Sequence, residues 1–252
     1  MDDRFGISNR VTARVSLAVL LLDDLTGLPI TGSNARAWIE GQKPPVKKND
    51  GWNAFLQLPC GTYTVTAEGG TYMRTTAEVQ VEKKLVTLLM RLSPNRLYRI
   101  PPDSIRVEGK AEPGAEITLF ARGKQAAFKL QKDAKAGDAS LSLYCGESAS
   151  PEGRLLRLTA PEGSGETVRI GEASKEAQGE YALDEALRNS YPKVGTAIAP
   201  AVRTRADENG SFFAVVRTSP SDSAVIVKAA GSTEITKEIE RGEGSPLTAE
   251  MI

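Results

Sequence analysis

Short stretches in which apolar and polar residues alternate run along most of this chain. Residues 11–22 alternate around Arg14 and Ser16 and end in an apolar run from Leu20 to Leu22. The same period of two, which is typical of half-buried strands, recurs over residues 35–40, 54–58, 63–67, 75–81 and 86–92. Turn-forming residues such as Asn49-Asp50-Gly51 separate these stretches. Closely spaced strands with turns between them predict a β-sandwich over residues 1–95.

A second sandwich is predicted after a proline-containing connector, residues 93–104. Its first part, residues 96–123, contains alternating stretches at 105–109 and 116–121, and its second part, residues 202–252, contains them at 203–206, 224–229 and 233–239. Residues 124–201 are predicted to form a small β-barrel inserted into a loop of this sandwich. The fold class is therefore all-β, with tandem β-sandwiches and an inserted small β-barrel. We also expect one or two helical turns at residues 184–190 and a loose tail from Gly242 onward.

Composition narrows the possible functions. Of 252 residues, 40% are hydrophobic, which can supply real cores. Lys plus Arg and Asp plus Glu number 32 each, so neither a basic stripe for nucleic acid nor a polybasic face for membranes is indicated. No apolar run is long enough to span a bilayer, and Met1-Asp2-Asp3-Arg4 lacks the charge order of a signal peptide. We expect cytoplasmic synthesis without a signal peptide, and a place in a virion or extracellular particle.

Histidine is absent, which removes the commonest general base and metal ligand and makes a serine triad impossible. We therefore predict a protein that is not an enzyme, with no catalytic, cofactor-binding or metal-binding residues. Glu108, Glu112 and Glu116 are interpreted as solvated strand-edge charges rather than as a hydrolase pair. Cys60 and Cys145, in different predicted domains, are expected to be buried free thiols.

Several polar and aromatic residues leave two interpretations open. Acids in predicted turns favour side-chain turn formation, with calcium binding as the alternative: Asp23, Asp24, Asp50 and Asp207 to Asn209. Four aromatic residues favour packing, with stacking on a sugar ring as the alternative: Trp38, Trp52, Tyr72 and Tyr98. Lys43, Lys47 and Lys48 surround Pro44-Pro45 and favour a loop that discourages strand-edge pairing over an anion site.

Three family resemblances cover most of the chain. Residues 13–92 resemble the carboxypeptidase regulatory-like, transthyretin-type sandwich through the patterns Asp24-x-Thr26-Gly27-x-Pro29-Ile30, Asn49-Asp50-Gly51-x-x-x-Phe55 and Leu58-Pro59-x-Gly61-x-Tyr63. Residues 105–121 with 203–239 resemble a bacterial Ig-like domain through Gly109-x-Ala111-x-Pro113-Gly114-Ala115 and Asp207-x-Asn209-Gly210-x-Phe212. Residues 130–199 resemble a small β-domain of phage tail and virion proteins through Ala136 to Leu141, Glu166 to Ile170, Leu183 and Gly195-Thr196.

These resemblances imply fold far more than function. Proteins built in this way are commonly parts of phage tails, contractile injection particles or cell surfaces. Our first hypothesis is a structural subunit or adaptor of a phage-tail-like or contractile injection assembly, with other protein subunits as partners in an oligomer and with no nucleic acid or membrane partner. The alternative is a cell-surface adhesin or carbohydrate-binding β-module, with a glycan as partner.

Overall fold

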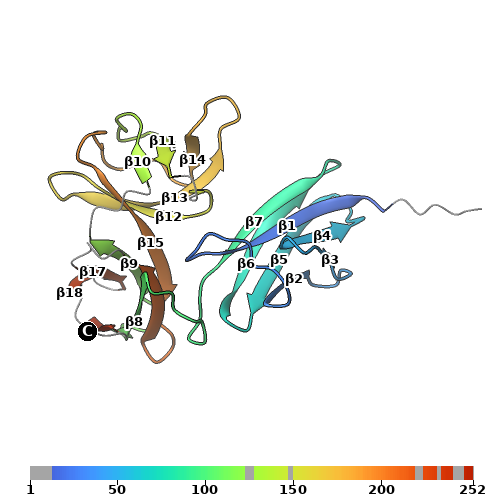
Figure 1. The fold of residues 1–252 in the computed structure, drawn as a ribbon, viewed down its shortest axis with the longest axis horizontal. Helices are drawn as coiled ribbons and strands as arrows, with labels where there is room; N and C mark the ends of the chain where they lie inside the picture. The colour runs from blue at the N-terminus through green and yellow to red at the C-terminus, as the bar shows by residue number, and fades with distance from the viewer. Residues whose placement is uncertain are drawn as a thin grey trace, which may run out of the picture. The chain divides into compact units, whose positions relative to one another are not determined.

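The structure is a computed structural model that describes residues 13–122, 128–146, 150–218, 224–231, 234–240 and 247–251. Within these ranges the chain is all-β, without a helix, which confirms the predicted fold class of tandem sandwiches (Figure 1). It divides into two compact units. The first holds the residues up to Leu22, Pro29–Gly69 and Arg74–Met90, and the second holds Asp23–Leu28, Gly70–Met73 and the chain from Arg91 onward.

The first unit is a two-sheet sandwich. One sheet has the order β3 (Val46–Lys47), β4 (Trp52–Leu56), β1 (Val15–Asp23) and β7 (Val86–Leu92). The other has the order β2 (Ala35–Ile39), β5 (Gly61–Gly69) and β6 (Tyr72–Val81). Side chains from both sheets are almost fully buried, such as Leu17 and Phe55 from one and Val65 and Val81 from the other. The alternation predicted from the sequence therefore places one face of each sheet in a shared core.

The second unit contains another sandwich. A three-stranded sheet has the order β16 (Ser211–Arg217), β8 (Ser104–Ala111) and β19 (Leu247–Met251). It packs against β9 (Glu116–Arg122), β15 (Ala197–Arg205), β17 (Ala224–Ala230) and β18 (Glu234–Glu240). The core joins Val107, Leu119, Phe212 and Val227, one residue from each of four strands. The segments 105–121 and 203–239, far apart in sequence, thus fold around one core, which the Ig-like resemblance implied.

The strands β9, β15, β17 and β18 belong to a nine-stranded sheet, which continues from β15 into the segment between residues 105–121 and 203–239. Its order runs β10 (Phe128–Leu130), β11 (Ser140–Cys145), β14 (Glu180–Leu183), β13 (Gly165–Ala173), β12 (Leu155–Thr159), β15, β9, β17 and β18. A separate core of this segment includes Phe128, Leu143, Ile170 and Tyr191. The long strand β15, orange in Figure 1, pairs with β12 through its first half and with β9 through its second half.

Three expectations from the sequence were wrong. Residues 247–251 are not a loose tail, because β19 pairs in parallel with β8. Residues 184–190 contain no helical turn, because the main-chain N–H groups of Arg188 and Asn189 donate to the Glu166 carboxylate instead. Both cysteines are free, as predicted, but Cys60 is exposed and Cys145 only half-buried.

Candidate ligand-binding site

A groove of about 690 Å³ lies along β2 in the first unit. Among the strands that the structure describes, β2 is the edge strand of its sheet and pairs with β5 alone, so no described strand of the sheet covers its outer side. Ala35, Ala37 and Ile39 point into the core, and the alternation of the strand therefore turns Arg36 and Trp38 to the opposite face. The loop after β2 adds Gln42 and Pro44, β3 adds Lys47 and β6 adds Arg74. We call this the Trp38 groove.

The indole of Trp38 is half-buried and contacts two guanidinium groups. The Cζ atoms of Arg36 and Arg74 lie 5.0 Å and 5.4 Å from the centroid of the ring. Arg36 also forms an ion pair with Glu68 on β5, directly across the strand pair. Cation–π contacts at exposed sites contribute about 0.5–1 kcal/mol each, so both arginines are held only weakly at the ring.

The main chain at the free edge of β2 is partly capped. The Lys47 ammonium donates to the carbonyl of Ala35, and the carbonyl of Ile39 accepts from the N–H of Gln42. These two carbonyls face away from β5. Main-chain groups alternate in direction along a strand, so the N–H and C=O groups of Ala37, which lies between Ala35 and Ile39, also face away from β5. Lys47 therefore blunts this sheet edge, as predicted for the lysine-rich loop.

Two of the other three aromatic candidates, Tyr72 and Tyr98, form contacts away from this groove. In the second unit, the hydroxyls of Tyr72 and Tyr98 both donate to Oδ2 of Asp23, and their rings lie edge to face with centroids 5.6 Å apart. Burial raises the pKa of both hydroxyls well above the usual tyrosine value, and the Asp23 carboxylate adds to the rise. Trp52 lies half-buried on β4, an inner strand of its sheet. The packing interpretation therefore holds for the two tyrosines.

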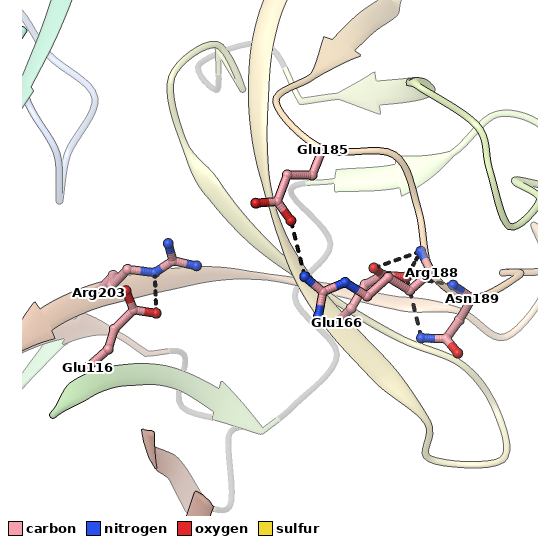
Figure 2. A network of polar contacts seen from close by, with 6 residues as sticks. All are labelled: Glu116, Glu166, Glu185, Arg188, Asn189 and Arg203. Atoms are coloured by element: carbon pink, nitrogen blue, oxygen red, sulfur yellow. Dashed lines mark hydrogen bonds and ion pairs between the residues drawn. The ribbon is translucent and has the colours of Figure 1, made fainter. Parts of the chain in front are cut away.

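A second groove, of about 550 Å³, lies on the nine-stranded sheet in the second unit. Several of its charged side chains pair with one another, and Figure 2 shows two of these ion pairs. Arg203 pairs with Glu116 at 3.3 Å and Arg188 with Glu185 at 3.2 Å, while Glu166 accepts from the main chain of the 188–189 turn. Such internal pairing leaves less charge for a ligand than the Trp38 groove offers. Glu116 is thus an ion-pair partner on β9, which is an inner strand and not a sheet edge, so its interpretation as a strand-edge charge was wrong.

One buried carboxylate has a perturbed pKa. Burial raises the pKa of Asp24 above its usual value, although the nearby Arg91 and Arg154 oppose the rise. In an enzyme such a group would mark a catalytic candidate. The cavity beside Asp24 and Arg154 has a volume of about 20 Å³, however, which is enough for one water molecule and too small for a substrate. The prediction that the chain is not an enzyme stays a prediction.

Three of the turn acids each accept local main-chain hydrogen bonds through one carboxylate oxygen. Oδ1 of Asp23 accepts from the N–H groups of Leu25 and Thr26, and Oδ1 of Asp207 accepts from those of Asn209 and Ser211. Asp50 accepts from the N–H of Trp52 at 3.4 Å. These bonds confirm the turn interpretation at the three positions. Within the described ranges, no group of three or more acids or cysteines could hold a metal ion, and no helix could cross a membrane.

Comparison with known proteins gives little beyond fold class. No family model matches the chain, and no curated protein matches it. Among solved structures, the Bacillus anthracis TIE protein aligns over 94% of this chain at 10% identity with a TM-score of 0.27, and the chain spans half the length of that protein. A putative carbohydrate-binding protein from Bacteroides uniformis aligns over 89% of this chain and 98% of its own at 11% identity and a TM-score of 0.25.

A minor pilin of Streptococcus agalactiae aligns over 93% of this chain and 94% of its own at 12% identity and a TM-score of 0.24. TM-scores this low carry no functional argument. The hypothesis of a phage-tail-like or contractile assembly stays a prediction. The specific families that the motifs resemble stay predictions, while the β-sandwich architecture that they share is observed.

Proposed function

We propose that this chain is a non-enzymatic binding module of the adhesin type, and that it binds carbohydrate in the Trp38 groove. The observation that carries the proposal is the half-buried indole on an edge strand inside a groove of about 690 Å³. Aromatic rings offer a flat apolar face to the C–H side of a sugar, while hydroxyls need donors and acceptors around its rim. Gln42, Glu40 and Arg74 line the same groove, and Arg74 contacts the ring itself.

The two arginines on the ring do not block a sugar. Arg36 has a side chain that is 75% exposed, and its ion pair with Glu68 is correspondingly weak. Moving one guanidinium off the indole costs about 0.5–1 kcal/mol, which a stacked sugar with two or three hydrogen bonds can offset. The displaced guanidinium stays within reach of the sugar hydroxyls as a multiple donor.

A glycan array followed by fluorescence titration tests this proposal. The chain has two tryptophans, so Trp52→Phe leaves Trp38 as the sole indole reporter. We expect array-positive glycans to change the emission of Trp52→Phe. Trp38→Ala should weaken binding by at least about tenfold, since truncation of an aromatic anchor costs about 2 kcal/mol. Silence on the array, or full binding by a folded Trp38→Ala variant, would refute the proposal.

The assembly hypothesis stays a second prediction, with protein subunits as partners and a virion or extracellular particle as location. The capped edge of β2 is a poor site for strand addition, so neighbours would have to use other surfaces. Sedimentation of native lysate with an antibody to this chain separates the two hypotheses. A megadalton fraction would favour the assembly, and a species near 27 kDa would favour the binding module.

A further inference from the structure

The charges around the Trp38 groove are unequal. Among its lining residues, Arg36, Lys47 and Arg74 are cations, and Glu40 is the single acid. Glu68 pairs with Arg36, and the ammonium of Lys47 donates to the carbonyl of Ala35. Arg74 has no carboxylate partner among the described residues, and its guanidinium contacts the indole of Trp38. One guanidinium therefore stands at the ring with its hydrogen-bond donors uncommitted.

We infer that the groove selects acidic saccharides, with a sugar carboxylate held by Arg74 while the pyranose ring stacks on Trp38. This inference rests on the proposed function and names its ligand class. Arg74 lies 5.4 Å from the ring centroid, so the same residue pair can contact the apolar face and the charged substituent of one sugar unit. A planar guanidinium matches a carboxylate through two parallel hydrogen bonds, which a neutral hydroxymethyl group cannot form.

An acidic peptide offers the same charge, but the edge of β2 disfavours it. An extended peptide would bind here by adding a strand to β2, through main-chain hydrogen bonds. The ammonium of Lys47 occupies the Ala35 carbonyl and a turn occupies that of Ile39, so two of the acceptors such a strand would need are taken. A sugar needs the ring and the guanidinium but no continuous strand edge, and therefore fits the groove better.

The test compares α-1,4-linked tetragalacturonic acid with α-1,4-linked galactotetraose, which differ only in carboxylate against hydroxymethyl. We expect the Trp52→Phe protein to bind the acidic tetramer about tenfold more tightly than the neutral one at low salt. A difference of about tenfold in affinity is what a partly solvated charged hydrogen-bonded pair contributes. Arg74→Gln should remove this preference, because it should weaken binding of the acidic tetramer about tenfold more than binding of the neutral one. Arg14→Gln makes the same charge change at an exposed site outside the groove and should keep the preference.

The outcomes separate the inference from the function on which it rests. Equal affinity for the two tetramers, or a preference that survives Arg74→Gln, overturns the inference while carbohydrate binding stands. Tight binding of polyglutamate that depends on Arg74 also overturns it, in favour of an acidic peptide. If neither tetramer binds and the glycan array is silent, the proposed function fails. Thermal melts of each variant confirm that loss of binding is not loss of folding.

Discussion

Replacement of Asp23 by alanine should be one of the most damaging single changes to the second unit. Asp23 ends β1 and is buried, and its carboxylate accepts four hydrogen bonds. Oδ1 accepts from the N–H groups of Leu25 at 2.8 Å and Thr26 at 3.0 Å, and Oδ2 accepts from the hydroxyls of Tyr72 and Tyr98. One side chain therefore satisfies donors from three separate segments of the chain.

The expected loss follows from these four bonds. Each hydrogen bond contributes about 1 kcal/mol net, and a buried donor left without an acceptor costs more than the bond it lost. The tyrosine hydroxyls are half-buried and can reach water, which recovers part of the cost. We therefore expect Asp23→Ala to lower the free energy of unfolding by about 3 kcal/mol, and Asp23→Asn, which keeps Oδ1, by about half as much.

Urea denaturation followed by circular dichroism at pH 7 measures this loss. Asp50→Ala is the matched control, because Asp50 is an exposed turn acid with one long bond of 3.4 Å to the N–H of Trp52. It should change stability by no more than about 0.5 kcal/mol. A loss below about 1 kcal/mol for Asp23→Ala would refute the reasoning, because a four-bond acceptor cannot then be distinguished from an ordinary surface acid.

Further predictions concern the polar contacts of the second unit and the edge of β2. Glu166→Ala should lower the free energy of unfolding by about 1–2 kcal/mol by freeing the turn it caps, while Glu185→Ala, an exposed pair, should cost under about 0.5 kcal/mol in the same urea assay. Burial and the Glu166 carboxylate raise the pKa of Tyr191 to about 12. The protonated Tyr191 hydroxyl therefore contributes its full share of the free energy of unfolding below pH ~10, and this share is lost as pH rises toward 12. The melting temperature of Tyr191→Phe should accordingly fall less steeply than that of the wild type as the pH is raised through this range. Lys47→Ala should uncap the Ala35 carbonyl and increase self-association in sedimentation velocity, and an unchanged monomer would contradict the edge-capping role.

The strands could be predicted because their signals are local. Alternation with a period of two placed the strand expected at 35–40 within one residue of β2, and that expected at 86–92 on β7. The Asx-Gly turns were equally visible, since Gly51 and Gly210 adopt φ values of 93° and 72° that other residues rarely take. In each case the information lies within a few neighbouring residues, and tertiary packing did not override it.

The contacts that join distant segments could not be predicted in the same way. Asp23 meets Tyr72 and Tyr98 across 49 and 75 positions, and no pattern in the sequence links a turn acid to those hydroxyls. β19 was missed for a related reason, because its parallel pairing with β8 depends on a partner more than a hundred residues away. The charge and hydropathy of the residues near 247 do not indicate that this segment pairs with β8.

The choice of Trp38 among four aromatic candidates shows where strand order becomes necessary. Trp38 and Trp52 both lie half-buried on short strands, and the sequence alone gives them similar prospects. β4 lies between β3 and β1, whereas β2 pairs on one side only. An indole beside a free sheet edge can line a groove, while one on an inner strand has neighbouring strands on both sides. If the Trp38 groove binds sugar, a Trp52→Ala variant that folds should keep that binding, and its loss would show that proximity to the free edge is not what selects the site.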